Sequence, residues 1–399
     1  MDAARIARIY LKPGHIQPVW AGHPWVFAQA VARIDGAPEA GAEVVVCDPR
    51  GEPLGRGLYS PRSAIAVRLF TRDPEQAIDT AFLEQGVRRA IARRAAHGLP
   101  SAETTGYRAL HAEGDGVPGL IVDVLGDVLA VQFGTVGLAL RAPALLDLLE
   151  ACFLPRAIVD RTSLKIAQQE GFTAELGVRR GDRSLASFQF RERGMGYDIP
   201  LTLAQKTGFY FDQRPLRARV EALSRGRRVL DTYAYVGSIA LAAARGGASQ
   251  VVAVDTSGPA LEVGARIARD NGLGEAVRYV KGDALAELER ARGAFDLVVC
   301  DPPKLAPNRT AAVKAIQTMR RLSAAACAAL ADGGVLVSCS CSAALGHGEL
   351  ARALALGARD AGRTAFVLER LFQGADHPVP AAFPEGLYLS SIIAEVGGG

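Results

Sequence analysis

The second half of the chain alternates short apolar runs with helical patterns, and this alternation restricts the fold more than any other feature. From Val229 the runs VLDTYA, VVAVDT, VRYVKGD and FDLVVCDPP are separated by segments whose apolar residues have helical spacing. Strands that alternate with helices build parallel, doubly wound sheets, which bind ligands at the carboxyl ends of the strands. We therefore expect an α/β domain whose functional residues lie at the strand ends.

The N-terminal half has other patterns and predicts two further domains. Residues 1–74 contain short apolar runs separated by Gly, Pro and Asp, which is typical of a small all-β module. A connecting helix is expected at 76–98, followed by a mixed α+β region with a hairpin that turns at Gly126-Asp127. A chain of 399 residues is long enough for three domains, which we place at 1–74, 75–195 and 196–399.

Composition excludes several classes of protein. Hydrophobic residues make up 49% of the chain and charged residues 22%, which is typical of a folded protein. The N-terminus lacks a signal-peptide pattern, and no later segment approaches about 20 uncharged apolar residues. We therefore expect a cytoplasmic protein with no membrane partner. The six cysteines form no C-x-x-C pair, so we expect reduced thiols and no metal.

Basic residues give a weaker indication of a nucleic-acid ligand. The net charge is only +4, but arginines cluster at 88–94, 178–183 and 225–228, where they could contact phosphates. Arginine clusters are more often solvated helix faces, so charge alone leaves both interpretations open.

Three acidic residues at the ends of three successive strands predict the cofactor. They are Asp231, Asp255 and Asp283. The first turn contains Gly237 but lacks the G-x-G-x-x-G spacing that binds a pyrophosphate, which disfavours a dinucleotide. S-adenosylmethionine has no phosphate and is cationic at its sulfonium and ammonium groups, so it suits an acidic turn. A single strand-end Asp often caps the next helix instead, but three in succession favour S-adenosylmethionine.

The three acids are expected to contact different parts of the cofactor. Asp231 suits the cationic end, Asp255 can accept hydrogen bonds from both ribose hydroxyls, and Asp283 lies near the adenine amino group. The cofactor residues predicted at the strand ends and in their turns are Asp231, Tyr233, Gly237, Ser238, Asp255, Thr256, Asp283 and Asp301.

The fourth and fifth strands end in residues that could perform chemistry. Asp301 and Lys304 flank two prolines, which form a rigid corner that can present polar groups to a planar base. The next strand ends in Ser-Cys-Ser-Cys-Ser, with Cys339 and Cys341 on one side of the strand and Cys341 nearer the expected active edge.

A cysteine at this position distinguishes between two kinds of methylation. Carbon 5 of cytosine is a poor nucleophile until a thiolate adds to carbon 6, whereas an exocyclic amino group needs no thiolate. A small buried hydrophobe remains the alternative role for such a cysteine. The predicted catalytic residues are Cys341, Asp301 and Lys304.

Segments along nearly the whole chain match one family. They are HPWVFAQAVARI, LGRGLYSPRSAIAVRLFT, EGDGVPGLIVD, QKTGFYFDQR, DPPK, SCS and ADHPVPAAFPEGLYL. On these segments the chain resembles the bacterial 23S ribosomal RNA 5-methylcytosine methyltransferases that have an N-terminal PUA domain. Two positions depart from the family pattern: Val236-Gly237-Ser238 stands where Thr-Gly-Gly is frequent, and Cys339 stands where phenylalanine is common.

This resemblance implies a multidomain α/β protein. Its parts would be a β-rich PUA pseudo-barrel, a central α+β domain and a Rossmann-like class I methyltransferase domain, with Cys341 as the nucleophile. The resemblance also adds four residues to the cofactor pocket, namely Lys206, Thr207, Tyr210 and Asp212.

We therefore predict an S-adenosylmethionine-dependent RNA methyltransferase that forms 5-methylcytosine, with 23S rRNA as its expected partner. Asp301 would bond the cytosine near N3 while Cys341 attacks C6. Two alternatives stay open: a guanine-N2 or guanine-N7 rRNA methyltransferase without a covalent adduct, and a non-catalytic RNA-binding assembly factor. The sequence gives neither the modified nucleotide, nor the base that removes the C5 proton, nor the form of the RNA substrate. It also leaves the oligomeric state open, with a homodimer as one option.

Overall fold

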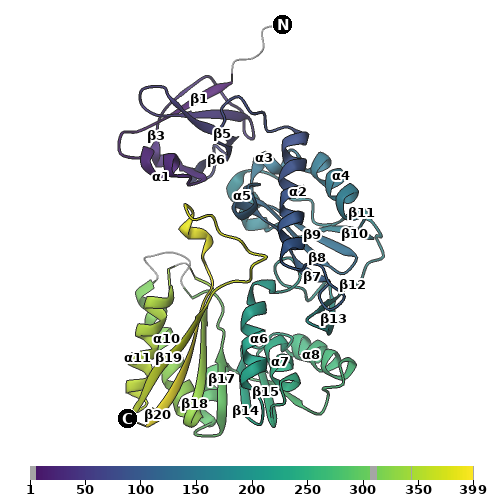
Figure 1. Cartoon of the computed structure of the whole chain (residues 1–399), viewed down its shortest axis with the longest axis vertical. Coiled ribbons are helices and arrows are strands. Elements are labelled where there is room, and N and C mark those ends of the chain that lie inside the picture. The colour runs from purple at the N-terminus through teal and green to yellow at the C-terminus, as the bar shows by residue number, and fades with distance from the viewer. Residues whose placement is uncertain (1–5, 306–311, 343, 399) are drawn as a thin grey trace. The chain divides into compact units, whose positions relative to one another are not determined.

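The chain divides into two compact units in the computed structural model, which describes residues 6–305, 312–342 and 344–398 (Figure 1). Unit 1 combines Met1–Phe209 with Ala375–Gly386, and unit 2 combines Tyr210–Gly374 with Leu387–Gly399. These units are coarser than the three domains expected from the sequence, so the sequence-derived boundaries remain predictions. Within the described residues, no helix is long and apolar enough to cross a membrane.

Unit 1 begins with a β-rich module. Its six strands form one sheet in the order β2-β6-β5-β4-β1-β3, in which β1 and β4 run parallel and the other neighbours run antiparallel. Alternate side chains such as Ile9, Val44 and Val67 are fully buried and build the core of the module, which explains the alternating apolar pattern. The elements are β1 (Ala7–Leu11), α1 (Ile16–Ala21), β2 (Trp25–Phe27), η1 (Ala28–Ala30), β3 (Val31–Asp35), β4 (Glu43–Cys47), β5 (Pro53–Tyr59) and β6 (Ile65–Thr71).

A mixed α/β region follows in unit 1. Helix α2 (Thr80–Ala96) begins where the Asp79 carboxylate accepts a hydrogen bond from the Phe82 amide at 2.9 Å. A five-stranded sheet has the order β11-β10-β9-β8-β7. The predicted hairpin is confirmed, because Leu125 pairs with Val128 across its turn. The other elements are β7 (Gly106–His111), η2 (Ala112–Asp115), β8 (Leu120–Leu125), β9 (Val128–Phe133), α3 (Val136–Ala139), α4 (Ala142–Phe153), β10 (Ala157–Asp160), α5 (Leu164–Glu170), β11 (Gly177–Gly181) and the separate hairpin β12 (Ser187–Glu192) and β13 (Met195–Pro200).

Unit 1 is completed by Ala375–Gly386, which we call the returning segment because it comes from near the end of the chain. The backbone carbonyl of Asp376 accepts a hydrogen bond from Nη2 of the buried Arg94 at 2.7 Å. Further along, the Phe383 ring packs on Trp25 of β2, with ring centroids 4.7 Å apart. The returning segment therefore contacts both the β-rich module and the mixed region.

Unit 2 contains the doubly wound sheet expected from Val229 onward (Figure 1). Its seven strands have the order β16-β15-β14-β17-β18-β20-β19. The first five are parallel, and β20 lies antiparallel between β18 and β19. The elements are η3 (Phe211–Gln213), α6 (Arg214–Leu223), β14 (Arg228–Thr232), α7 (Ser238–Arg245), β15 (Gln250–Asp255), α8 (Gly258–Asp270), β16 (Val277–Lys281), α9 (Ala284–Arg290), β17 (Phe295–Cys300), α10 (Ala312–Ala329), β18 (Leu330–Ser340), α11 (His347–Asp360), β19 (Arg363–Leu371), η5 (Pro384–Gly386, in the returning segment) and β20 (Ser390–Gly398).

The order of these strands fixes the position of the binding crevice. The chain builds β14, β15 and β16 outward on one side and then returns to place β17 on the other side of β14. Apolar residues of β14 and β17, such as Leu230 and Val298, are buried and pack with α10 and α11 in one core. The direction of the winding changes between β14 and β17, so ligands are expected at the carboxyl ends of these two strands.

Candidate cofactor site and active site

Two of the predicted acids lie at the point where the winding changes direction. Asp231 is in β14, and Asp301 directly follows β17. The two strand ends are fixed to one another because the Thr232 hydroxyl donates a hydrogen bond to the Val299 carbonyl at 2.7 Å. The charge of Asp301 contributes to the raised pKa of Asp231, which places the two carboxyl groups in one electrostatic environment.

The turn after β14 has a strained backbone. Tyr233, Tyr235 and Gly237 have φ angles of 61°, 54° and 75°, in the left-handed region. This region is unfavourable for tyrosine, and such strain is concentrated at ligand-binding sites. At Gly237 a Cβ atom would also lie 2.9 Å from the ring of Tyr279 in β16. The turn therefore requires glycine at this position for two separate reasons.

Asp231 is buried, and its carboxylate is only partly hydrogen-bonded within the described residues. The residue is 1% exposed, and its Oδ2 accepts a hydrogen bond from the Ala240 amide at 3.0 Å. Its Oδ1 is buried and has no hydrogen-bond partner among the described residues. Burial, together with the charges of Asp301 and Asp255, raises the pKa of Asp231 to about 8. A buried oxygen of this kind is costly unless a ligand donates to it, so the site suits a cationic donor group.

The other two strand-end acids stabilise local structure. Asp255 accepts one hydrogen bond from the Tyr235 amide and one from the Ser257 amide, both at 2.8 Å, and so supports the strained turn. Asp283 is exposed and caps α9 by accepting a hydrogen bond from the Ala286 amide at 3.0 Å. Capping does not exclude ligand binding, because a carboxylate can accept several hydrogen bonds.

Gln213, a residue of η3, was not among the predicted site residues. Its Nε2 donates a hydrogen bond to Asp301 Oδ2 at 3.0 Å, and the residue is 6% exposed. Its Oε1 is buried and has no partner within the described parts of the chain. The sequence feature that could have indicated Gln213 is the unusual segment QKTGFYFDQR, in which Gln213 follows Asp212.

Tyr210 connects the Asp301 side of the site with the cysteine. Burial raises the pKa of the Tyr210 hydroxyl above its usual range, and the charges of Tyr235, Asp301, Asp212 and Cys341 add to this shift. The rings of Tyr210 and Tyr235 meet edge to face, with centroids 6.0 Å apart. The structure therefore brings Tyr210, Asp301 and Cys341 into one neighbourhood.

The two candidate cysteines differ in exposure. Cys339, in β18, is fully buried, and its Sγ accepts a hydrogen bond from the Ser391 hydroxyl at 3.3 Å. Burial raises the pKa of the Cys339 thiol well above its usual value. Cys341 follows the end of β18 and is only half-buried. A reagent or substrate can therefore reach Cys341 more readily than Cys339.

The remaining predicted residues divide between the two units. In unit 1, Lys206 is exposed, whereas the Thr207 hydroxyl is buried and donates a hydrogen bond to Asp123. In unit 2, Asp212 is buried and its Oδ2 accepts a hydrogen bond from the Tyr388 hydroxyl at 2.7 Å. The other predicted residues of unit 2 are the half-buried Tyr233 and Ser238 and the exposed Thr256 and Lys304.

The side chains at the strand ends fit S-adenosylmethionine. A buried carboxylate oxygen of Asp231 is available to a cation, and acids at the next two strands can accept hydrogen bonds from a ribose and an adenine. In the described residues, no group of three or more His, Cys, Asp or Glu side chains could hold a metal ion.

Comparisons with known proteins show which families the chain is similar to. A PUA-like domain model matches residues 9–72, and an S-adenosylmethionine-dependent methyltransferase model matches residues 176–387. The chain is 36% identical over 397 residues to ribosomal RNA large subunit methyltransferase I of Photobacterium profundum, covering 97% of this chain and 99% of the relative. Its identity to the protein of the same name from Shigella boydii serotype 4 is 35% over 399 residues, or 98% and 99% of the two chains.

Solved structures confirm the predicted fold. A structure described as a methyltransferase complexed with SAH has a TM-score of 0.84 at 16% identity, covering 97% of this chain and 99% of that one. A structure described as a SAM-dependent methyltransferase from Streptococcus mutans has a TM-score of 0.81 at 16% identity, with the same coverage. At this low identity the likeness shows the fold alone.

Proposed function

Since the chain belongs to the S-adenosylmethionine-dependent methyltransferases, with relatives named ribosomal RNA large subunit methyltransferase I, we propose that it methylates carbon 5 of a cytosine in large-subunit ribosomal RNA. The cofactor is S-adenosylmethionine, which supplies an electrophilic methyl group when bound. The observation that supports carbon 5 is the half-buried Cys341, which lies in the same neighbourhood as Asp301 and Tyr210. Methylation of an amino group would need no such thiol.

The strand-end residues would bind the cofactor by complementary charge and hydrogen bonding. Oδ1 of Asp231 would accept a hydrogen bond from the ammonium group, Asp255 would bind the ribose hydroxyls and Asp283 the adenine amino group. We assign supporting contacts to the remaining unit 2 residues of the predicted pocket, which are Tyr233, Gly237, Ser238, Thr256, Tyr210 and Asp212. The cofactor contacts of Lys206 and Thr207, which lie in unit 1, stay predictions of the family resemblance.

Cys341 would activate the cytosine by covalent addition. The thiolate forms a bond to C6, the electrons of the C5–C6 double bond shift towards C4 and N3, and N3 takes up the proton that the thiol has released, with Asp301 as the hydrogen-bond partner of that proton. The resulting enamine is nucleophilic at C5 and takes the methyl group as the methyl–sulfur bond of the sulfonium breaks, while N3 gives up its proton and the C4–N3 double bond re-forms. A base then removes the C5 proton, and the returning electrons break the bond from sulfur to C6 and release the thiolate.

Gln213 positions Asp301 through its hydrogen bond of 3.0 Å. Lys304, which is exposed beside this corner, is a further candidate for contact with the substrate.

The N-terminal PUA-like module supports an RNA substrate. A cytosine that reacts in a pocket must be unpaired or extruded, at a cost of a few kcal/mol. Contacts between RNA and the rest of unit 1 can offset that cost, because RNA is recognised largely by shape and through unpaired nucleotides.

The test is nucleoside analysis of large-subunit ribosomal RNA after incubation with the protein and methyl-labelled cofactor. We expect label in 5-methylcytidine, and we expect Cys341→Ala to abolish it. Cys339→Ala is the matched control and should retain activity, because Cys339 is fully buried. Label in a methylguanosine, or activity in Cys341→Ala, would contradict the proposal.

A second experiment tests the covalent step directly. In RNA that contains 5-fluorocytosine, the fluorine at C5 cannot leave as a proton, so the adduct with Cys341 should accumulate. A protein–RNA band that resists denaturation should form with the wild type and with Cys339→Ala, but not with Cys341→Ala. Absence of the band from active wild-type protein would count against covalent addition.

A further inference from the structure

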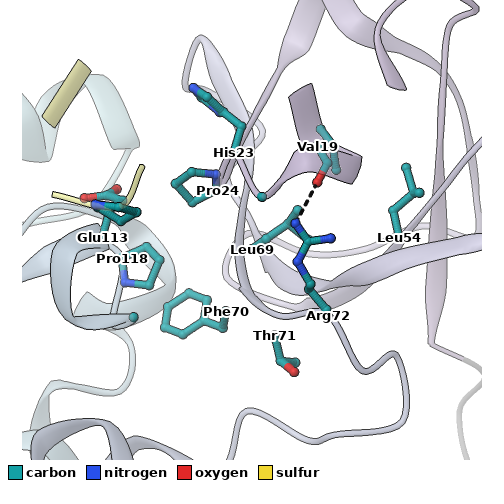
Figure 2. A pocket seen from close by; sticks show the side chains of 13 residues that line it. Val19, His23, Pro24, Leu54, Leu69, Phe70, Thr71, Arg72, Glu113 and Pro118 are labelled. Carbon is teal, nitrogen blue, oxygen red and sulfur yellow. Dashed lines mark hydrogen bonds between the residues drawn. The ribbon is translucent and has the colours of Figure 1, made fainter. Parts of the chain in front are cut away.

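Unit 1 contains a pocket of its own, lined by residues that the strand-end site of unit 2 does not use. These residues come from α1 and the loop after it, from β5 and β6, from η2 and the loop after it, and from the returning segment (Figure 2). The volume is about 210 Å³. Pockets for drug-sized ligands measure roughly 300–1,000 Å³. This pocket is therefore too small for a dinucleotide or for S-adenosylmethionine and suits one flat ring system.

The pocket has apolar walls. Leu69 and Phe70 of β6 line it together with Pro24 and Pro118, which approach from other parts of unit 1 (Figure 2). Phe70 is half-buried and offers an aromatic ring, and proline rings are apolar and rigid. Such walls suit the face of a nucleobase, which RNA-binding proteins contact by stacking.

The polar groups in the wall are held in place by other residues. The Glu113 carboxylate accepts a hydrogen bond from the Trp25 indole at 2.8 Å, and its side chain is 11% exposed. His23 is buried, and its Nε2 lies 3.1 Å from Glu385 of the returning segment. These groups can hydrogen-bond the edge of a ring without losing side-chain freedom, because the fold has already ordered them.

Arg72 provides a positive charge beside the pocket. Its Nη1 donates a hydrogen bond to the Trp20 carbonyl at 2.7 Å. Its Nη2 donates one to the Val19 carbonyl at 3.5 Å, which is the dashed line in Figure 2. The guanidinium therefore caps the C-terminal end of α1. Gly22 leaves room for this contact, since a Cβ there would lie 2.9 Å from Arg72 Nη2. Arg72 is exposed, so its guanidinium can also contact a phosphate.

An exposed aromatic side chain lies next to the pocket in the chain. Trp20 is 68% exposed and follows Val19, which lines the pocket. An exposed tryptophan beside a positive charge is a typical stacking platform for single-stranded nucleic acid.

We propose that this pocket binds one unpaired nucleotide of the RNA substrate. The base enters the apolar pocket, its phosphate contacts Arg72, and a neighbouring base stacks on Trp20. This proposal rests on the proposed function for the identity of the ligand as RNA. It adds a second contact point, separate from the cytosine that is methylated.

Equilibrium binding tests the proposal without any chemistry. The chain has two tryptophans, Trp20 and Trp25, and Trp25 holds Glu113 in the pocket wall, so Trp25 is kept and the fluorescence change that is lost in Trp20→Phe is assigned to Trp20. The probe is a short unstructured RNA oligonucleotide, compared with the same strand annealed to its complement and with a free nucleoside monophosphate. We expect the single strand to quench Trp20 fluorescence in the full chain, with much weaker effects of the duplex and of the mononucleotide. Equal quenching by the duplex, or saturation by the mononucleotide at the same concentration, would overturn the proposal.

Substitutions separate the stacking contact from the phosphate contact, with unlabelled protein and a dye-labelled RNA. Trp20→Ala should weaken binding about tenfold. Its matched control is Leu164→Ala, on a side chain that is 64% exposed, and it should bind like the wild type. Arg72→Ala should lower the slope of log Kd against log salt by about one, whereas Trp20→Ala and Arg72→Lys should keep the slope. Thermal melting of each variant shows whether α1 and its module remain folded.

The outcome is independent of the methylation site. Binding is measured without cofactor and in the Cys341→Ala background as well as the wild type. If nucleoside analysis shows another methylated base but Trp20→Ala still weakens RNA binding, the pocket proposal stands and the proposed function fails. If folded Trp20→Ala and Arg72→Ala proteins bind RNA like the wild type, the pocket proposal fails and the proposed function is unaffected.

Discussion

Gln213 and Asp301 are 88 residues apart in the chain, yet Nε2 of Gln213 donates a hydrogen bond to Oδ2 of Asp301 at 3.0 Å. This contact connects η3 to the carboxyl end of β17 at the crevice of the doubly wound sheet. The carboxylate proposed to face the cytosine is thus oriented by a residue outside the strand-end motifs.

Loss of this contact should affect catalysis more than cofactor binding. We expect Gln213→Ala to lower kcat by up to roughly 100-fold, because a small displacement of a positioned group is costly in an active site. The dissociation constant of S-adenosylmethionine, measured by calorimetry, should change little, and Gln213→Glu should fail to restore activity because it places two carboxyl groups together. Gln189→Ala, on an exposed position, is the control. A large loss of cofactor affinity with unchanged kcat would contradict a positioning role.

The raised pKa of Asp231 predicts a pH-dependent stability of the cofactor-free protein. Its pKa is about 8 in the folded chain, above the ordinary value of 3.8, so the folded state holds this proton more tightly. This proton therefore stabilises the folded state fully below pH 3.8. The stabilisation decreases as the pH rises from 3.8 to about 8, and it is lost above about pH 8. We expect the unfolding free energy of the wild type, relative to Asp231→Asn, to fall between about pH 4 and about pH 8 in urea melts.

Cofactor binding should show the opposite dependence on pH. The cationic ligand favours the ionised carboxylate, so affinity should increase as the pH rises towards about 8. Asp231→Asn should bind more weakly and lose this dependence, whereas Asp147→Asn, whose carboxylate is 68% exposed, should behave like the wild type. A pH profile that is the same in wild type and Asp231→Asn would show that another group is responsible.

Gly237→Ala should combine a backbone cost with a steric clash. A left-handed φ costs alanine about 1–2 kcal/mol, and the new Cβ would lie 2.9 Å from the Tyr279 ring. The matched control is Gly226→Ala, which has φ +71° but no atom within 4 Å of the added Cβ. Denaturant melts should show the smaller loss in Gly226→Ala, and only Gly237→Ala should weaken S-adenosylmethionine binding. Equal losses in both variants would exclude a role for the contact with Tyr279.

The buried ion pair of Arg94 and Asp115 should be important for the stability of unit 1. Arg94 is 1% exposed and donates to both carboxylate oxygens, at 2.5 and 2.7 Å. Arg94→Ala leaves a buried carboxylate poorly compensated and should lower the unfolding free energy by about 3–5 kcal/mol. Arg93 also contacts Asp115, but its side chain is 43% exposed, so Arg93→Ala should cost much less. If Arg94→Ala melts like Arg93→Ala, then Arg93 alone is sufficient to compensate the charge of Asp115 when Arg94 is absent.

The parallel sheet was predictable because each of its features is local in sequence. Runs such as FDLVVC are apolar and short enough for buried strands, and an acid follows directly where the strand ends. Asp231, Asp255 and Asp283 could therefore be assigned to successive strand ends without knowledge of their contacts. The short apolar runs of residues 1–74 predicted a small all-β module for the same reason, whereas its assignment as a PUA domain came from the family resemblance.

Other features depend on contacts between distant parts of the chain. Neither the left-handed φ angles of Tyr233 and Tyr235 nor the contact of Gln213 with Asp301 has a local pattern. Period-two alternation places Cys339 and Cys341 on one side of a strand, but only the fold shows that β20 covers Cys339 through Ser391. These positions are fixed by tertiary packing, which a single sequence does not specify.

The returning segment also determines when the protein can complete its folding during synthesis. The chain leaves unit 2 after Gly374, completes unit 1, and re-enters unit 2 at Leu387, just before β20 fills the position between β18 and β19. Because both units require residues that follow Gly374, neither has all of its parts until the ribosome has translated this stretch. A nascent chain therefore completes its two units together, and a premature stop before this segment leaves both incomplete.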